Sequence, residues 1–426
     1  MTKVIEPRTL AGFRDFLPEQ MAVRNRAVEI LREVFEKYGF VPLETPTLEF
    51  QDILLGKYGE EAEKLMYLFE DAGKRPVGMR YDLTVPVARV VAQYPSLPKP
   101  FKRYQLQPVW RADKPQKGRY REFMQCDIDT LGSTSPVADA EILSIISECL
   151  TKLGFNNFGI KINSRHILFG ILRASGLKPD YYQTASQTID KADKRSIEDL
   201  DNELESKGLG ENLFSEVISQ EIAKVSQKFG QTGKTGDDHL DEIINIARKM
   251  GANGIQFSPI TVRGLDYYTG AIFETIVTEP KIGSLGGGGR YDKLIGTFIG
   301  EDLPAVGYSF GLDRIVDVIT ELNLWPDLPK TPTKVLVTVF SPELLKKSLD
   351  ITTKIREGNT NAEIYLDPEA RLDKQLKYAD AKGIPYAVII GPDEAEKNLV
   401  TLKDLRNKTQ TTITPEEAVR KIREED

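Results

Sequence analysis

The sequence contains very little histidine and cysteine, and this scarcity excludes several kinds of chemistry. Its 426 residues include only two histidines, His166 and His239, and only two cysteines, Cys126 and Cys149. A histidine base, a Ser-His-Asp triad or a histidine-ligated metal therefore has almost no candidate residues. Because the cysteines form no CxxC pair, neither a disulfide framework nor a thiolate zinc site is expected. We expect a reaction that depends on arginines, carboxylates and the positioning of substrates, with no metal held by histidine or cysteine.

The sequence also lacks long apolar runs and an excess of positive charge. It has no stretch of about 18 apolar residues and no signal-peptide pattern at the polar start MTKVIEPRTL, so we expect a cytoplasmic protein without a membrane anchor. The formal net charge of -7 disfavours nonspecific coating of nucleic acid but is compatible with a local basic groove. With 40% apolar residues, the chain can form two to four globular domains of about 100 to 200 residues each.

One candidate basic groove lies between residues 111 and 121. The basic side chains of this stretch are Arg111, Lys114, Lys117, Arg119 and Arg121. Only Asp113 opposes their charge, and Tyr120 and Phe123 stand beside them. Such a run can be a solvated face or a phosphate-binding groove, and charge alone does not decide between the two.

The pattern of apolar residues divides the chain into a discontinuous first domain with an insertion. Residues 1–166 and 252–324 carry the strand and helix signals of one domain. Within it, the segment from Phe101 to Gly132 reads as strand, charged loop and strand, and its alternation indicates an antiparallel pair with one face toward a ligand. Residues 167–251 carry helical patterns without strong strand runs, which predicts a helical insertion.

The end of the chain has a different pattern. Residues 325–333, WPDLPKTPT, form a proline-rich linker. Residues 334–426 then alternate between strands and helices, which predicts a compact α/β domain with a parallel or mixed sheet.

The most informative segment is RGLDYYTGAIFE, which begins at Arg263 and ends at Glu274. It places a permanent cation, a carboxylate and two phenols around paired glycines, a combination of residues that is typical of a small-molecule binding pocket. The alternative interpretation is a β-hairpin with an Arg–Asp pair on the surface.

Together with three other regions, this segment resembles the histidyl-tRNA synthetase family of class II aminoacyl-tRNA synthetases. The matching segments are YDLTVP at 81–86, VWRAD at 109–113 with its return strand to Asp129, RGLDYYTG at 263–270 with GGGRYD at 287–292, and AVGYSFGLDRI at 305–315. The resemblance implies an α+β fold, in which an antiparallel-sheet catalytic domain with a helical insertion precedes a C-terminal α/β anticodon-binding domain. It also implies a histidine–tRNA ligase, which uses ATP and Mg²⁺ to convert L-histidine to histidyl-adenylate and transfers the aminoacyl group to the 3′ end of histidine tRNA.

The resemblance assigns the phosphate-handling residues. It implies that Arg111 grips the α-phosphate of ATP, that Arg121 reaches the γ-phosphate and that Phe123 stacks on adenine. Arg314, in the first turn of a helix, would face the triphosphate. Asp113 stands where the family often has glutamate, and we leave it as a possible adenine contact.

The histidine pocket follows from the other motifs. The resemblance implies that Arg263 is the histidine-specific arginine of the family, and we expect Arg263 and Arg111 to be the catalytic residues. Because both imidazole nitrogens need partners for specificity, we assign Asp129 and Tyr268 to the ring. The residues expected around the rest of the amino acid are Asp82, Thr84, Gln125 and Tyr267. Strand alternation turns Gln125, Asp127 and Asp129 to one face, and Asp127 could instead form a salt bridge elsewhere.

Two further partner assignments complete the expectations. Gln116 resembles the residue that touches the extra guanosine at the 5′ end of histidine tRNA. The amphipathic helix before Gly39, with the extended edge around Pro42 and Pro46, suits a symmetric two-fold contact, so we predict a homodimer formed largely through residues 20–50.

Three other functions compete with this interpretation. A regulatory paralogue of the family, which acts with ATP phosphoribosyltransferase in histidine biosynthesis, usually lacks the anticodon domain and has eroded motifs, whereas this chain keeps both. Another class II synthetase, such as the prolyl or threonyl enzyme, would share the phosphate-handling arginines but not RGLDYYTG. A nucleic-acid-binding module without catalysis is disfavoured by the acidic net charge.

Overall fold

The structure is a computed structural model that describes residues 5–58, 63–192, 195–263 and 267–424. Residues 264–266, three members of the RGLDYYTG motif, therefore lie outside the described residues. The chain divides into two units, Met1–Asp15 with Arg24–Leu324 and Phe16–Val23 with Trp325–Asp426. Among the described residues, none of the helices is long and apolar enough to cross a membrane.

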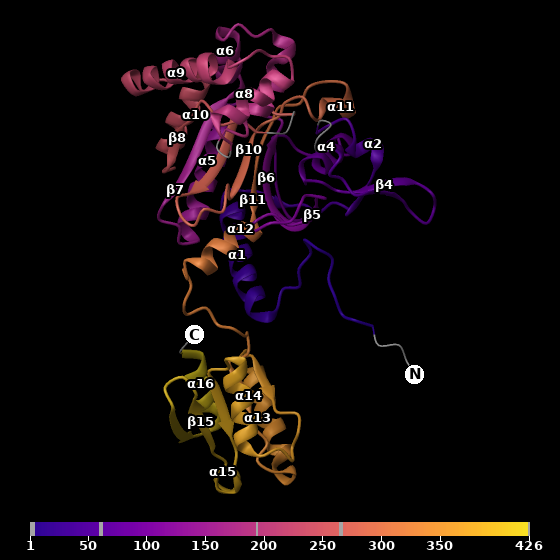
Figure 1. Ribbon diagram of the computed structural model, residues 1–426. Helices are drawn as coiled ribbons and strands as arrows, with labels where there is room; N and C mark the ends of the chain where they lie inside the picture. Colours follow the sequence, from indigo (N-terminus) through magenta and orange to yellow (C-terminus); the bar gives the residue numbers. More distant parts are fainter. Residues whose placement is uncertain (1–4, 59–62, 193–194, 264–266, 425–426) are drawn as a thin grey trace. The chain divides into compact units, whose positions relative to one another are not determined.

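An eight-stranded, mostly antiparallel sheet organises the first unit (Figure 1). Its strand order is β1-β5-β6-β11-β10-β9-β7-β8. The strands are β1 (Val41–Pro42), β5 (Phe101–Trp110), β6 (Glu122–Leu131), β7 (Phe158–Ser164), β8 (Ile255–Phe257), β9 (Ala271–Val277), β10 (Gly286–Arg290) and β11 (Ala305–Gly311). The edge strands β1 and β8 pair in parallel with β5 and β7, and the other neighbours are antiparallel. The paired strands β5 and β6 confirm the predicted strand, loop and strand.

Helices α1 (Pro18–Lys37) and α5 (Pro136–Lys152) cover one face of this sheet. Helix α1 forms because its apolar residues recur at helical spacing, and it buries Ile30, Val34 and Phe35 on that stripe. The Phe35 ring lies 5.9 Å from the ring of Phe310 in β11. Cys126 of β6 is paired with Phe310 across the sheet, so both face the same helical layer. The alternate residues of β6 and β11 consequently face the opposite side.

The first unit also contains a smaller, three-stranded sheet, formed by the chain between β1 and β5. Its strand order is β2 (Leu48–Phe50), β4 (Pro76–Met79) and β3 (Leu68–Glu70). The same part of the chain forms helices α2 (Gln51–Leu54) and α4 (Thr84–Gln93). Asp82 caps α4, because its Oδ1 accepts hydrogen bonds from the backbone N–H groups of Thr84 and Val85, each at 3.1 Å. This cap fixes the YDLTVP motif at a helix start.

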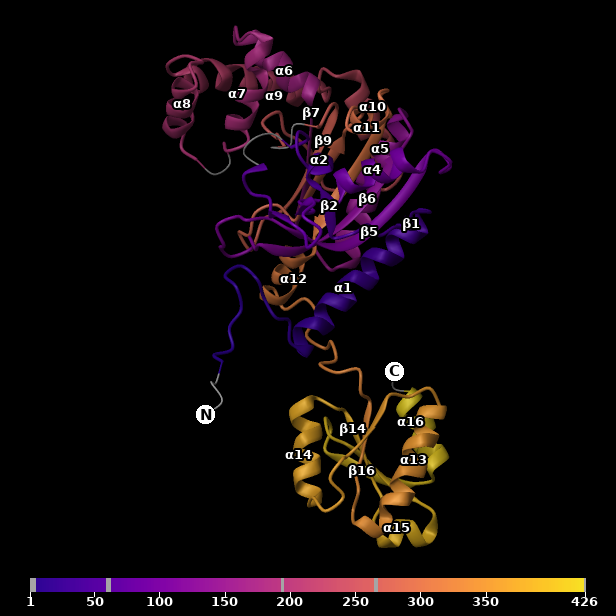
Figure 2. The same cartoon turned by 90° about the vertical axis from the view of Figure 1, so that its right-hand side faces the viewer.

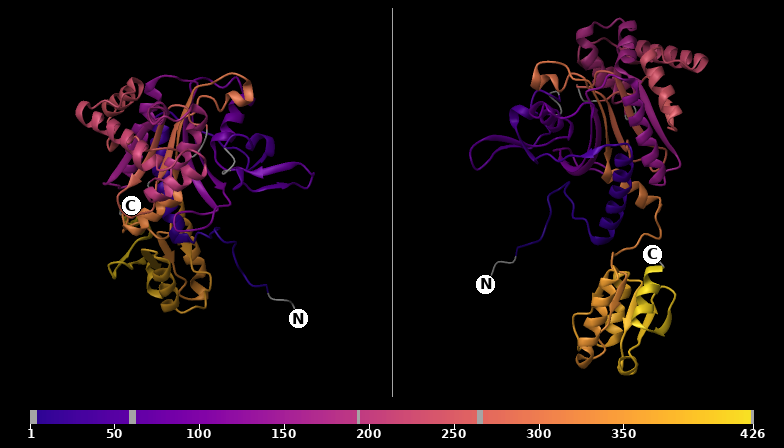
Figure 3. Two further views of the ribbon diagram at one scale, coloured as in Figure 1. Left: turned by 45° about the horizontal axis from the view of Figure 1, so that its top comes forward. Right: turned by 180° about the vertical axis from the view of Figure 1, so that it is seen from behind.

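The chain between β7 and β8 contains helices and no strand among its described residues. Its elements are α6 (Arg165–Ala174), η1 (Pro179–Tyr181), α7 (Tyr182–Ile189), α8 (Ile197–Ser206), η2 (Leu213–Ile218), α9 (Ser219–Thr232) and α10 (Asp238–Lys249). Helices α6 to α9, in magenta and pink, gather at one end of the first unit (Figures 1 and 3). Helix α10 differs, because it packs along α5 and so joins the helical layer of the main sheet.

The second unit contains a five-stranded mixed sheet between helices, as the alternation predicted (Figure 2). The strand order is β13 (Ala362–Ile364), β12 (Val335–Val337), β14 (Tyr386–Ile389), β15 (Val400–Asp404) and β16 (Thr409–Ile413). Helix α14 (Leu372–Lys382) covers one face, and α13 (Leu345–Glu357) and α16 (Pro415–Glu424) cover the other. Strand alternation explains this, since Leu336 packs with Ala379 of α14 while Val335 and Val337 pack with Ile355 of α13. Short pieces η3 (Pro342–Leu344) and α15 (Pro392–Lys397) complete the unit.

Candidate active site

A cavity of about 660 Å³ lies in the first unit, on the face of the main sheet that α1 and α5 leave open. Strand β10, the loop of residues 111–121 and Asp190 after α7 contribute to its walls. The predicted site residues that line it are Asp82, Thr84, Arg111, Phe123, Gln125, Asp129, Arg263, Tyr267, Tyr268 and Arg314. The structure thus brings together side chains from four motifs that are far apart in the sequence.

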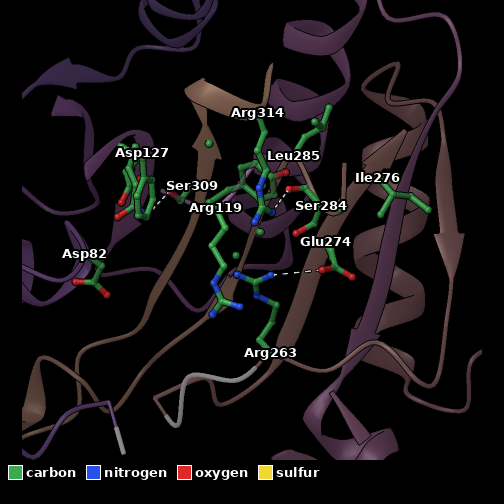
Figure 4. Close-up of a pocket in the computed structure, with 18 of the residues that line it drawn as sticks. Asp82, Arg119, Asp127, Arg263, Glu274, Ile276, Ser284, Leu285, Ser309 and Arg314 are labelled. Carbon is green, nitrogen blue, oxygen red and sulfur yellow. Dashed lines mark hydrogen bonds and ion pairs between the residues drawn. The ribbon is translucent and has the colours of Figure 1, made fainter. Parts of the chain in front are cut away.

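Four arginines face one another on one side of the cavity. Arg119, Arg263 and Arg314 extend toward the same space in Figure 4, and Arg111 is held nearby by a hydrogen bond from its Nε to the Tyr81 carbonyl at 3.0 Å. Burial lowers the pKa of Arg314, and so do the positive charges around it, which belong to the other three arginines. Mutually repelling cations at one cavity wall are the signature of a site that receives a polyanion.

Helix α12 (Leu312–Glu321) begins directly after β11 and places Arg314 in its first turn. The Arg314 Nε donates to the Gly118 carbonyl at 2.7 Å, and its Nη1 donates to the Ser284 carbonyl at 2.6 Å. Arg314 therefore connects the tip of the 111–121 loop to the segment before β10.

The glycine run in β10 makes room for Arg263. A Cβ atom added to Gly287 would overlap the Arg263 guanidinium, so a side chain at this position would displace it. Arg263 Nη1 lies 3.6 Å from Glu274 Oε1 in β9 (Figure 4). Among the described residues, its buried Nε has no hydrogen-bond partner. A donor in this state is ready for a ligand acceptor.

Arg121 is not among the described residues that line the cavity, so its assignment to the γ-phosphate stays a prediction. Its Nε donates to the Asp113 carbonyl at 3.0 Å, on the outer side of the loop. Arg119 lines the cavity instead, and its Nη2 donates to Asp113 Oδ1 at 2.8 Å. Asp113 also lines the cavity but is engaged by this ion pair. Gln116 is exposed beside the turn at the loop tip and does not appear among the described lining residues.

Carboxylates gather on the other side of the cavity. Gln125, Asp127 and Asp129 all line it, as strand alternation predicted. Asp129 is already paired, since its Oδ2 lies 2.6 Å from Arg103 Nη2 and its Oδ1 accepts a hydrogen bond from Tyr291. The structure therefore places the salt bridge on Asp129 and not on Asp127, the reverse of the alternative that the sequence suggested.

Asp127 carries a buried oxygen that neither a hydrogen bond nor an ion pair engages among the described residues, whereas Asp129 Oδ2, which also lacks a hydrogen bond, lies in the ion pair with Arg103. The Asp127 oxygen is Oδ1, and Gln125 Oε1 likewise has no hydrogen-bond partner among the described residues. Burial raises the pKa of Asp127 to about 7, with Arg103 opposing the shift and Asp129 adding to it. Two buried acceptors at one wall require donors, and a ligand with N–H groups would supply them.

The phenols of the motif lie between the two sides. The hydroxyl of Tyr267 donates to Asp82 Oδ2 at 3.2 Å, and the ring of Tyr268 lies 4.8 Å from that of Tyr267. Asp82 also accepts a hydrogen bond from Tyr58 at 2.7 Å, in addition to capping α4. Burial raises the pKa of Tyr268, so this phenol stays neutral and can donate a hydrogen bond.

Among the described residues, no cluster of three or more histidine, cysteine, aspartate or glutamate side chains could hold a metal. His166 has a side chain that is 73% exposed, and neither histidine belongs to the described lining of the cavity. The arginines that line the cavity can align two anions, and neither His166 nor His239 is among the described lining residues that could transfer a proton.

An antiparallel sheet that carries an arginine-lined pocket, in a chain with a further α/β unit, defines a class II aminoacyl-tRNA synthetase. A family model described as histidyl-tRNA synthetase matches residues 12–315, and one described as an anticodon binding domain matches residues 334–425. The chain belongs to the histidyl-tRNA synthetase family, a family of ATP-dependent aminoacyl-tRNA ligases.

Relatives of similar length support this assignment. The histidine–tRNA ligase of Cytophaga hutchinsonii is 40% identical over 452 residues, which cover 98% of this chain and 99% of that protein. The histidine–tRNA ligase of Aeropyrum pernix is 41% identical over 429 residues, covering 98% of each. The crystal structure of histidyl-tRNA synthetase from Nostoc sp. PCC 7120 has a TM-score of 0.82 at 29% identity and covers 99% of this chain and 100% of that one.

The regulatory paralogue is less supported. A structure from Bacillus halodurans, described as an ATP phosphoribosyltransferase regulatory subunit/histidyl-tRNA synthetase, has a TM-score of 0.73 at 19% identity, which shows the shared fold alone.

The sequence interpretation missed Arg103, Arg119 and the available oxygen of Asp127. A signal for Arg103 existed, because pairing of the two predicted strands places it directly opposite Asp129. A signal for Arg119 was weaker. The turn at Lys117 and Gly118 brings Arg119 opposite Gln116, but only the structure shows which arginine then faces inward.

Proposed function

We propose that this cavity activates L-histidine with ATP and then transfers the histidyl group to the 3′ end of histidine tRNA. The observation that carries the proposal is the division of one pocket into a wall of arginines and a wall of buried acceptors. The first suits a triphosphate and a carboxylate, and the second suits an imidazole and an ammonium group.

In the activation step, the carboxylate of histidine attacks the α-phosphate of ATP in line and pyrophosphate leaves. The attacking group is already an anion, so the chain need not supply a base. Arg263 and Arg111 would hold the two reacting anions together and stabilise the charge that develops at the α-phosphate. Arg119 and Arg314 would hold the outgoing phosphates, and Phe123 would stack on the adenine.

We include Mg²⁺ as the ion that accompanies ATP. Such an ion needs only one or two protein carboxylates when phosphates and water supply the remaining ligands. Glu274, beside Arg263, fits that requirement on the arginine side of the cavity. When bound, Mg²⁺ neutralises phosphate charge.

Recognition of histidine would use the acceptor wall. Asp127 or Asp129 accepts from one ring nitrogen, while the neutral phenol of Tyr268 donates to the other. Gln125, Thr84 and Asp82 surround the α-amino group, and Tyr267 holds Asp82 in place. A site of this kind rejects analogues that lack the ring nitrogens, because its buried polar atoms would then remain unpaired.

The remaining parts of the chain serve the tRNA and the assembly. Residues 334–426 would bind the anticodon, and exposed Gln116 would contact the acceptor end. We further propose a cytoplasmic homodimer formed through residues 20–50, because Val41, Leu48 and Phe50 are apolar yet 48%, 42% and 52% exposed.

Histidine-dependent ATP–pyrophosphate exchange tests the proposal when each amino acid is supplied in turn. We expect exchange with histidine and with no other amino acid. Exchange with proline or threonine, or none with histidine, would contradict it.

A further inference from the structure

The N-terminal segment Ala11–Arg14, which we call the strap, lies against the loop of residues 111–121. The backbone N–H of Arg121 donates to the Gly12 carbonyl at 2.9 Å, and Arg121 Nη1 donates to the Ala11 carbonyl at 3.4 Å. Gly12 has a φ of +86°, and a Cβ at this position would lie 2.8 Å from Arg121 Cγ. The strap therefore occupies the outer surface of the loop at van der Waals distance.

Arg14 attaches the strap to two further parts of the site. Its guanidinium lies 3.2 Å from the centroid of the Tyr120 ring, which is a cation–π contact. It also forms an ion pair with Asp313, at the start of α12 and next to Arg314. Tyr120 and Asp313 both line the cavity, so a residue outside the cavity is bonded to two of its walls.

The contacts explain which arginine enters the cavity. Arg121 is held outward by the carbonyls of Ala11 and Asp113, and the neighbouring ring of Tyr120 is covered by Arg14. With these two residues fixed, the loop turns Arg119 inward toward Arg263 (Figure 4).

We propose that the strap is a positioning element of the ATP site, and that Arg14 fixes the loop in the conformation that directs Arg119 at the triphosphate. The inference rests on the proposed function of the cavity. It concerns the ATP subsite, because Gly12 and Arg14 of the strap contact the loop of residues 111–121 and helix α12.

Substitution of Arg14 tests the proposal, because the buried carboxylate of Asp313 keeps its other partners when Arg14 is removed. Asp313 keeps an ion pair with Arg24 at 2.8 Å and a hydrogen bond from the Met124 N–H at 2.8 Å, so Arg14→Ala should fold. We expect Arg14→Ala to raise the KM for ATP about tenfold, the scale of one lost cation–π contact in a partly buried site. The KM for histidine should stay within about twofold. Arg14→Lys keeps the charge but loses the planar stack, and should lie between the two.

Two controls accompany these variants. Arg420→Ala removes an exposed arginine of α16 that pairs with Glu424, and removal of residues 1–9 ends before the strap begins. Both should keep the KM for ATP of the unaltered protein.

The possible outcomes separate the strap from the proposed function. An unchanged KM for ATP in Arg14→Ala would overturn the proposal, and so would parallel rises for ATP and histidine with a lower melting temperature, which indicate general packing. A lack of histidine-dependent exchange in the unaltered protein would refute the proposed function itself and is visible before any variant is made.

Discussion

At the scale of single residues, the central feature is a pair of buried aspartates, Asp127 and Asp129, beside one buried arginine, Arg103. Arg103 is 0% exposed and pairs with Asp129, while Asp127 and Asp82 lie close enough to affect one another's ionisation. An ion pair that loses one partner leaves a buried charge, which costs about 3–5 kcal/mol. The two aspartates of β6 should therefore respond differently to the same substitution.

Asp127→Asn should raise the KM for histidine at least about tenfold and leave the KM for ATP nearly unchanged, because it replaces a buried carboxylate with a neutral amide, a weaker acceptor, without breaking an ion pair. Asp129→Asn should raise the KM for histidine and also lower the melting temperature, because Arg103 loses its charged partner. Pyrophosphate exchange and thermal unfolding of both variants distinguish the roles. The opposite pattern, with stability lost only in Asp127→Asn, would show that the assignment is reversed.

The pKa of Asp127 makes a further residue-scale prediction. Burial raises this pKa from 3.8 to about 7, so the folded state holds a proton that the unfolded state releases, and stability is lost as the pH rises from about 4 to 7. Asparagine carries no such charge. Asp127→Asn should therefore gain melting temperature relative to the unaltered protein at pH 7.5 but not at pH 4.5. A constant difference across this window would contradict the raised pKa.

At the scale of elements, the sequence predicted a helix or strand correctly where its apolar residues recur with a clear period. Elements without such a period were not predicted. Helix α1 was predicted from the helical spacing of its apolar residues, and the strand pair β5–β6 from its alternation. Strand alternation also predicted that Gln125 and Asp129 face the same side of the sheet. Strand β16 was not predicted, because its sequence TQTTI is polar and its residues are largely exposed at the edge of the sheet. The position of α10 along α5 depends on tertiary packing, which a helical period alone does not reveal.

The same limit applies within the site. Motif spacing identified Arg263, Arg111 and Arg314, each of which lines the cavity. It assigned Arg121 to the γ-phosphate, although spacing alone does not separate Arg119 from Arg121, which lie two residues apart on the same basic segment. In our proposal, contacts with the strap decide between them, and these join residues that are more than 100 positions apart in the sequence.

Strand β10 provides an element-scale prediction. Gly287→Ala should displace the Arg263 guanidinium, and we expect histidine activation to fall at least about tenfold while the protein remains folded. Gly170→Ala is the matched control, because a Cβ there meets nothing within 4 Å and the residue lies in helix α6. Equal activities of the two variants would show that β10 does not set the position of Arg263.

At the scale of the whole molecule, the chain has separate cores for separate tasks. The cores of the second unit consist of residues between Val335 and Ile422, and the cavity belongs entirely to the first unit. Removal of residues 334–426 should therefore weaken tRNA charging at least about 100-fold more than adenylate formation, since anticodon contacts are lost while the ATP site is kept. Equal loss in both assays by a truncated protein with native circular dichroism would refute this division.

The most direct measurement is the rate of histidine-dependent pyrophosphate exchange by Arg263→Ala, with Arg420→Ala as the control for loss of an exposed arginine. Arg263 would hold both the histidine carboxylate and the α-phosphate, so its contribution should be larger in the transition state than in the ground state. We predict that the rate constant falls at least about 100-fold, the usual loss for one donor to a developing anion, with an unchanged melting temperature. A rate close to that of the unaltered protein would show that Arg263 only supports the fold, and would contradict the mechanism.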